Sequence, residues 1–293
     1  KKISIASKGE MDNVLEGLKG GKFIVSDVKK GKKTRSPYPP YITSSLQQDA
    51  HNKLGFTVKR TMVAAQQLYE GVDIKGSGTE GLITYMRTDS VRVSETAIAQ
   101  ARDFVKKQWG ESFLPGKPRF YTGKKGAQNA HEAIRPTSVQ RTPDSIRDSL
   151  TPDQYKVYNL IWSRFVASQM SDAQYDTLNV SVECNEYLFK ASGMTLIFKG
   201  FLQVLGDDSD DKQEKIPPVE KGEVLKVKKL EDKQYFTQPP ARYTEASLIK
   251  SLEDDGIGRP STYAPVISTI LQRGYVEKEK KSLVPTYLGK VVN

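Results

Sequence analysis

The residues best suited to chemistry lie in Leu82–Ser90, which reads Leu-Ile-Thr-Tyr-Met-Arg-Thr-Asp-Ser. Tyr85 and Arg87 alternate there, so an extended backbone would place both side chains on the same side. A phenol is a weak nucleophile at neutral pH because its pKa is about 10. A guanidinium beside it would favour the phenolate and bind a phosphate under attack. The pattern therefore suits attack on phosphorus, although it also suits a structural tyrosine.

A second candidate segment, Ala130–Thr137, contains His131, one of two histidines in the chain. An imidazole can donate a hydrogen bond to a phosphate oxygen or move a proton. The glycine- and lysine-rich loop at 122–126 would let the backbone approach a phosphate chain. No second histidine stands four residues after His131, so the segment is not the zinc-binding helix motif. A structural histidine is the alternative.

The third candidate segment is Asp255–Tyr263, which reads Asp-Gly-Ile-Gly-Arg-Pro-Ser-Thr-Tyr. Its two glycines permit close backbone approach. A helix is expected to begin at Ser261, and the free amides and dipole of its first turn would suit a phosphate. Arg259 and Thr262 would add two contacts. The alternative is a capped helix with a surface arginine.

The elements that must position these segments begin with strands and continue with helices. Alternating residues predict a strand at 22–28, followed by a basic turn at 29–35. Caps and glycine stops predict a helix at 44–54, with Thr43 as its cap, and a loop occupies 111–150. Further helices are expected at 58–70, 95–109 and 152–170.

Beyond residue 176 the period of the sequence changes to two, which predicts a sheet. The expected strands are 177–184, 187–191, 195–200 and 223–229. A helix at 245–254, a helix at 262–273 capped by Ser261, and a hairpin at 275–287 follow, in an order typical of winged helices.

The fold class is therefore multidomain α+β, with three predicted domains. A strand-rich domain is built from 1–36 and 172–235. A helical domain, 37–171, carries Tyr85 and is inserted into the strand-rich one. A second helical, winged-helix-like domain is expected at 236–293 and is only partly present.

The charge balance favours a polyanionic partner without proving one. The chain carries 45 basic and 35 acidic residues, a net charge of +10, with the basic excess concentrated in residues 1–60. No apolar run approaches the roughly 18 residues that a membrane span needs. The single cysteine, Cys184, allows no internal disulfide and fits a half-buried strand position in a protein of the reducing cytoplasm.

Taken together and in this order, the three segments resemble bacterial DNA topoisomerase I, a type IA topoisomerase. The matching residues are Ile83–Ser90, Ala130–Thr137 and Gly256–Ala264. Tyr38–Phe56 and Gln272–Val276 are also similar to that family. The resemblance covers most of the chain.

The resemblance implies an isomerase that relaxes negatively supercoiled DNA without ATP. One strand is cut through a transient 5′-phosphotyrosine, the other strand passes through the gap, and the cut is resealed. By motif match Tyr85 is the nucleophile, Arg87 positions the scissile phosphate, and His131 handles the phosphate or a proton. The implied fold is part of the type IA toroid, in which a strand-rich arch acts as a hinge.

The resemblance also implies residues that contact DNA, chiefly single-stranded DNA. Glu132 and Arg135 would in addition support His131. These DNA-binding residues are Glu132, Arg135, Arg259, Ser261, Thr262 and Tyr263.

The sequence departs from the family pattern in its metal ligands. The family's N-terminal metal-binding (Toprim) domain has a strand followed by Asp-x-Asp-x-Glu, and no such segment occurs here. Asp208-Ser209-Asp210 lies in a polar acidic loop, and the C-terminal zinc modules are also absent. We therefore expect a central fragment without a metal site of its own. Mg²⁺ would be the cofactor of the full-length enzyme, and the metal-binding domain of the same polypeptide would be a partner.

Three alternatives to a topoisomerase fragment come from other classes. The isolated chain is predicted not to relax DNA, and it could be a non-catalytic clamp or gate that binds single strands in a salt-dependent way. A tyrosine recombinase also uses tyrosine, histidine and arginine, but its tyrosine normally follows the arginine–histidine cluster, whereas Tyr85 precedes His131. A scaffold without a nucleic-acid partner does not account for the three segments.

Overall fold

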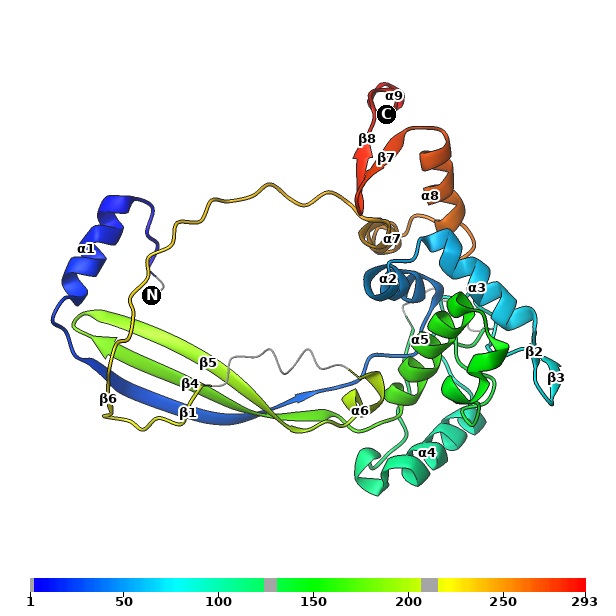
Figure 1. Ribbon diagram of the computed structural model, residues 1–293, viewed down its shortest axis with the longest axis horizontal. Helices are drawn as coiled ribbons and strands as arrows, with labels where there is room; N and C mark the ends of the chain where they lie inside the picture. The colour runs from blue at the N-terminus through cyan, green and yellow to red at the C-terminus, as the bar shows by residue number, and fades with distance from the viewer. Residues whose placement is uncertain (1–2, 124–130, 207–215) are drawn as a thin grey trace. The chain divides into compact units, whose positions relative to one another are not determined.

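The chain divides into two compact units, which we call the sheet unit and the helical unit. The computed structural model describes residues 3–123, 131–206 and 216–293 (Figure 1). The sheet unit is drawn from Lys1–Arg35, Ala173–Lys199 and Gly206–Pro239, and the helical unit from Ser36–Asp172, Gly200–Leu205 and Pro240–Asn293. The acidic segment 207–214 and the end of the 122–126 loop lie outside the described residues.

The sheet unit is an antiparallel sheet with the strand order β5-β4-β1-β6. Its strands are β1 (Phe23–Arg35), β4 (Ala173–Cys184), β5 (Tyr187–Phe198) and β6 (Val224–Leu225). Strands β4 and β5 form a hairpin whose turn places Asn185 in the left-handed region, at φ 52°. The Asn185 side-chain amide donates to the carbonyl of Gly17, which ties this turn to helix α1 (Lys8–Leu18).

Two sequence predictions for the N-terminal region were wrong. Residues 8–18 form helix α1 instead of continuing a strand-like region, and the hydroxyl of Ser7 caps it by accepting from the amide of Glu10. The basic residues 29–35 continue β1 instead of forming a turn. They pair with β4 as far as Arg35↔Ala173, and this long-range pairing overrides the weak strand preference of lysine.

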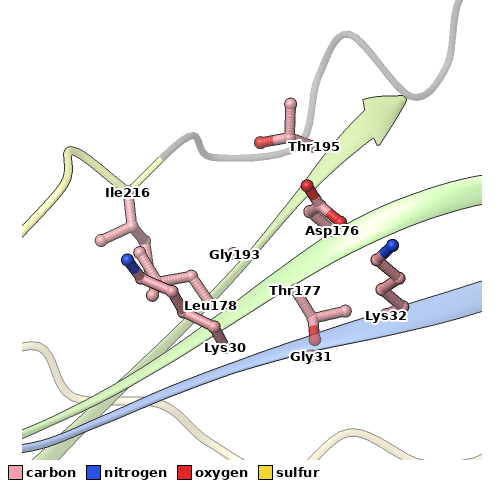
Figure 2. Close-up of a pocket in the computed structure, with 9 residues that line it drawn as sticks. All are labelled: Lys30, Gly31, Lys32, Asp176, Thr177, Leu178, Gly193, Thr195 and Ile216. Atoms are coloured by element: carbon pink, nitrogen blue, oxygen red, sulfur yellow. The ribbon is translucent and has the colours of Figure 1, made fainter.

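A hollow of about 530 Å³ lies on the sheet where β1, β4 and β5 run side by side (Figure 2). Lys30 and Lys32 of β1 and Asp176 of β4 are among the residues that line it. Lys32 and Asp176 are direct cross-strand partners, and such an opposite-charge pair contributes modestly to an antiparallel ladder. The basic excess of the N-terminal region therefore falls partly on this strand.

Helix α5 (Pro152–Ser168) is one of the main helices of the helical unit, and its inward residues are almost fully buried. The other main helices of this unit are α2 (Thr43–Leu54), α3 (Val58–Glu70), α4 (Glu95–Trp109), α7 (Glu245–Asp254) and α8 (Tyr263–Gln272). Shorter elements are β2 (Val72–Ile74), β3 (Gly78–Glu80), η1 (Glu111–Phe113), η2 (Asp144–Ser149), α6 (Leu202–Leu205), β7 (Val276–Glu279), β8 (Ser282–Pro285) and α9 (Tyr287–Val292). Val157, Ile161 and Phe165 of α5 are at most 1% exposed.

Local capping chemistry explains why several helices start where the sequence predicts. Thr151 caps α5 by accepting from the amide of Gln154, whose side chain accepts in return from the amide of Thr151. The hydroxyl of Ser94 likewise accepts from the amide of Ala97 at the start of α4. Such caps satisfy amide groups that have no partner inside the helix.

Two predicted caps were wrong. Helix α2 begins at Thr43 itself, and the Thr43 hydroxyl binds a distant segment instead of its own helix. Helix α8 begins at Tyr263, and Ser261 does not cap it. The predicted loop at 111–150 is mostly irregular in its described part, with the short helices η1 and η2 within it. The hairpin of β2 and β3, which precedes α4, was not foreseen.

The C-terminal helices belong to the helical unit through a shared core. Ile249, Tyr263 and Ile267 pack with Val58 at the start of α3. The buried carboxylate of Glu245 accepts a hydrogen bond of 2.7 Å from the amide of Val58 and pairs with Lys278. A separate domain at 236–293 therefore stays a prediction. No helix of the described residues is long and apolar enough to span a membrane.

Candidate active site

Side chains are alternately buried and exposed along the segment that carries Tyr85, and its backbone bends at Thr84, Met86 and Arg87. Met86 and Thr88 are at most 3% exposed, whereas Tyr85 is 37% exposed and Arg87 is also exposed. The side chains of Tyr85 and Arg87 are therefore both accessible from solvent.

Helix α2 fixes the segment on the C-terminal side of Tyr85. The hydroxyl of Thr43 donates to the carbonyl of Met86 at 2.8 Å and accepts from the amide of Thr88 at 2.9 Å. The amide of Thr43 donates to the carbonyl of Thr88 at 2.9 Å. One buried residue thus holds the backbone on both sides of Arg87.

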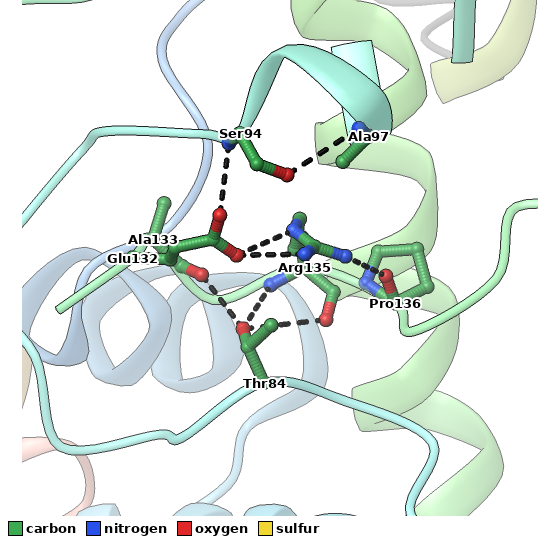
Figure 3. Close-up of polar contacts among 7 residues, drawn as sticks. All are labelled: Thr84, Ser94, Ala97, Glu132, Ala133, Arg135 and Pro136. Atoms are coloured by element: carbon green, nitrogen blue, oxygen red, sulfur yellow. Dashed lines mark hydrogen bonds and ion pairs between the residues drawn. The ribbon is translucent and has the colours of Figure 1, made fainter. Parts of the chain in front are cut away.

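The second sequence segment fixes the backbone on the N-terminal side of Tyr85 (Figure 3). The hydroxyl of Thr84 donates to the carbonyl of Ala133 at 2.7 Å and accepts from the amide of Arg135 at 3.0 Å. The amide of Thr84 donates to the carbonyl of Arg135, and Ile83 forms an isolated β-bridge with Pro136. The histidine segment and the tyrosine segment are therefore brought side by side.

The ring of Tyr85 touches two other rings. Its centroid is 5.8 Å from that of His131 and 5.3 Å from that of Tyr69, which lies in the last turn of α3. Arg87 donates from Nη2 to Oε1 of Gln66, also on α3, at 3.5 Å. Tyr85, Arg87 and His131 therefore gather at one place, beside a helix that the sequence analysis did not connect with them.

Glu132 and Arg135 form a partly buried ion pair next to this place (Figure 3). One carboxylate oxygen of Glu132 accepts from the Arg135 guanidinium at 2.7 Å, and the other accepts from the amide of Ser94 at 2.8 Å. The Arg135 guanidinium also donates to the carbonyl of Pro136. Both side chains therefore brace the histidine segment, and their contact with DNA stays a prediction.

The third sequence segment meets the tyrosine segment at a cavity of about 540 Å³. Thr88 and Asp89 line it together with Arg259, Pro260 and Tyr263. The cavity is therefore adjacent in sequence to the predicted catalytic residues, although Tyr85 itself is not among the residues that line it.

In the third segment, some of the groups predicted to bind phosphate already form hydrogen bonds within the protein. Arg259 donates from its guanidinium to the carbonyl of Gly258 at 2.7 Å, and its amide donates to the hydroxyl of Thr262 at 2.7 Å. Ser261 is exposed, whereas Tyr263 is buried. Burial is the main cause that raises the pKa of the Tyr263 phenol. The nearby negative charges of Glu253 and Asp89 also raise it.

The comparison with known proteins decides the family. A sequence profile of the family described as DNA topoisomerase matches residues 1–293. This chain belongs to the DNA topoisomerase family. The solved structure of full-length topoisomerase I from Thermotoga maritima matches 100% of this chain with 40% sequence identity and a TM-score of 0.85. The topoisomerase chain described here spans 47% of that protein.

The family match confirms the resemblance to bacterial type IA topoisomerases, an isomerase class, that the three segments indicated. It also confirms a mixed fold of helices and antiparallel sheets. The arrangement of the predicted domains and the roles of individual residues stay predictions.

The residues around Tyr85 do not fit a magnesium site. Both carboxylate oxygens of Glu132 already accept hydrogen bonds, and Glu70 accepts from the side-chain amide of Gln66 at 2.7 Å. Within 3–123, 131–206 and 216–293 no three histidine, cysteine, aspartate or glutamate side chains gather in a metal-binding group.

Three other tyrosines of this topoisomerase chain are buried or half-buried, and their phenols donate hydrogen bonds. These bonds are Tyr41 to Asp49, Tyr121 to the carbonyl of Ser168, and Tyr158 to the carbonyl of Arg141. Burial raises the pKa of Tyr121 to about 12 and raises the pKa of Tyr41 and of Tyr158 well above its usual value. These phenols are therefore poor candidates for a nucleophile, in contrast to the more exposed Tyr85.

The hydrogen bonds of Thr84 predict a loss of stability when its hydroxyl is removed. Thr84→Val keeps the shape of the side chain but leaves the carbonyl of Ala133 and the amide of Arg135 without this partner. We expect the free energy of unfolding to fall by about 1–3 kcal/mol in urea denaturation. Thr84→Ser is the matched control and should retain most of the stability. Equal stability of the Val and Ser variants would contradict this role.

The raised pKa of Tyr121 predicts a loss of stability in alkali. Below about pH 10, the usual pKa of an unfolded tyrosine, the contribution of Tyr121 to the free energy of unfolding is fully present. As the pH rises toward the folded value of about 12, the unfolded chain releases a proton that the folded chain keeps, so the free energy of unfolding falls.

Tyr121→Phe should therefore lose less stability than the wild type between about pH 9 and pH 11, by about 1 kcal/mol. The control is Tyr235→Phe, which changes a tyrosine that is 83% exposed. Chemical denaturation at the two pH values measures the effect. If Tyr121→Phe lost as much free energy of unfolding as the wild type between the two pH values, the Tyr121 phenol would not contribute to the loss of stability in alkali.

Proposed function

We propose that this chain forms the tyrosine-bearing part of a DNA topoisomerase that relaxes negatively supercoiled DNA through a transient break in one strand. The carrying observation is that Tyr85 and Arg87 lie on a segment anchored at both ends, with the ring of His131 beside that of Tyr85. Family membership and the similarity to a full-length topoisomerase I support the proposal. Relaxation without ATP follows from conserving the energy of the broken bond in the covalent link.

In the proposed cleavage step, the phenolic oxygen of Tyr85 bonds to the phosphorus of one phosphodiester. The bond from phosphorus to the 3′ oxygen of the preceding nucleotide breaks, and that oxygen leaves as a hydroxyl after taking up a proton. The phenol gives up its proton in the same step, so atoms and charge balance. Religation is the reverse, and the product is a 5′-phosphotyrosine.

The neighbouring side chains have distinct proposed roles. Arg87 would bind the non-bridging phosphate oxygens and offset the charge that develops on them during attack. His131, whose ring touches that of Tyr85, would donate to the phosphate or move a proton. Glu132 and Arg135 would keep His131 in place through their ion pair.

The cavity beside Thr88 is the proposed place for the continuing single strand. Arg259, Thr262 and Tyr263 lie on or next to it, and Gly256 and Gly258 allow close approach of a backbone. The exposed Ser261, which precedes helix α8, would add a hydroxyl contact. Base contacts there would tolerate many sequences and weaken with salt, as is usual for single-strand binding.

Metal-dependent steps would need carboxylates from outside this chain. The side chains near Tyr85 do not form a magnesium site, so we propose that a metal-binding domain of the same polypeptide supplies it and that Mg²⁺ acts there. The sheet unit would serve as the hinge of the type IA toroid. The helical unit, which carries Tyr85, would be inserted into the chain of the sheet unit. Action on DNA in the cytoplasm is part of the same proposal.

The test mixes the full 293-residue chain with a separately produced metal-binding domain of a bacterial topoisomerase I, Mg²⁺ and a single-stranded oligonucleotide. A label at the 3′ end of the oligonucleotide should stay on the protein in a denaturing gel, and a label at the 5′ end should be released. Tyr85→Phe should abolish the adduct, because no phenolic oxygen remains, whereas Tyr287→Phe should not.

Three outcomes would contradict the proposal. They are an adduct in Tyr85→Phe, retention of the 5′ label, and the absence of an adduct in the wild-type mixture. The chain alone should bind the oligonucleotide without cutting it. Relaxation of supercoiled DNA by the chain alone would refute the need for a separate metal-binding domain.

A further inference from the structure

A tyrosine outside the three sequence segments touches the predicted nucleophile. Tyr69 meets the ring of Tyr85 edge to face, at 5.3 Å between centroids and 67° between planes. This geometry is favourable because the positive edge of one ring faces the negative face of the other. We propose that Tyr69 is a positioning residue that holds the ring of Tyr85 in the orientation for attack. This inference rests on the proposed function and refines it.

Backbone packing, and not a mobile loop, brings the two tyrosines together. The amide of Leu82 donates to the carbonyl of Leu68 at 2.7 Å. A Cβ on Gly81 would lie 2.8 Å from the carbonyl oxygen of Tyr69, which is closer than real Cβ atoms come. Only glycine allows this approach, so the chain leading to Tyr85 is pressed against the last turn of α3.

The exposure of the pair argues against a purely structural role. Ala65 and Leu68 of the same helix are fully buried and already anchor it. Tyr69 is 41% exposed and Tyr85 is 37% exposed. Much of both rings therefore remains in solvent, and the contact contributes little to the core. Its main consequence is to limit the orientations of Tyr85.

The same face of α3 also touches the predicted phosphate-binding arginine. Gln66 precedes Tyr69 by three residues and Glu70 by four, so the three side chains share one face of the helix. Gln66 accepts from Arg87 at 3.5 Å and donates to Glu70 at 2.7 Å. One rigid helix face thus contacts both reacting side chains, which lowers the entropy lost when they meet the phosphate.

The first test measures the position of Tyr85 and needs no cleavage. Tyrosines of the 293-residue chain are replaced by fluorotyrosine, and the ¹⁹F signal of Tyr85 is assigned as the one missing from Tyr85→Phe. Tyr69→Leu should move this signal toward its position in the unfolded chain, because the ring current of residue 69 is lost. Tyr69→Phe should leave it in place, and so should the control Tyr287→Leu, which changes a tyrosine that is 84% exposed.

The second test measures the consequence in the mixture that contains the metal-binding domain. In single-turnover cleavage, Tyr69→Leu should lower the rate at saturating oligonucleotide roughly tenfold, while the oligonucleotide Kd changes by less than about twofold. Tyr69→Phe should restore the rate. A weakened Kd with an unchanged rate would instead assign Tyr69 to DNA binding and overturn the proposal.

The two tests separate this inference from the proposed function. An unmoved Tyr85 signal in Tyr69→Leu overturns the positioning role whatever the cleavage result. An adduct that requires Tyr85 but forms equally fast in Tyr69→Leu also overturns the positioning role and leaves the proposed function intact. An adduct that survives in Tyr85→Phe overturns the proposed function, and the positioning role falls with it.

Discussion

Two threonine hydroxyls hold the backbone on either side of Tyr85, and the geometry of the site depends on them. The hydroxyl of Thr43 holds the backbone around Arg87, and that of Thr84 holds the histidine segment against the tyrosine segment. Both hydroxyls donate and accept, so each replaces two contacts that water would otherwise make. A tyrosine that is partly exposed can therefore keep a defined position without being buried.

The helices of this topoisomerase chain were largely predictable because their start and stop signals are local. The capping box at Thr151 and the glycine after α3 need only neighbouring residues. The errors occurred where distant pairing decides the outcome. Residues 29–35 look like a basic turn in isolation, yet they form a strand because β4, far away in sequence, pairs with them.

The residues of the candidate site were predictable, but their supports were not. The resemblance of three segments to type IA topoisomerases singles out Tyr85, Arg87 and His131, and the structure brings these three together. Their roles stay predictions. The roles of Thr43 and Tyr69 could not be foreseen, because each acts on a backbone or ring that a different element carries. The spacing of Gln66, Tyr69 and Glu70 marks one helix face, but no sequence signal shows what that face touches.

The most direct measurement of the central claim is to locate the DNA-linked residue by mass spectrometry. Trypsin cuts after Lys75 and Arg87, and the peptide between these cuts contains Tyr85 as its one tyrosine. After cleavage of an oligonucleotide, nuclease and trypsin digestion should leave a nucleotide on this peptide, attached through its 5′ phosphate. A nucleotide found on any other peptide, or an unmodified 76–87 peptide from an isolated adduct, would contradict the account.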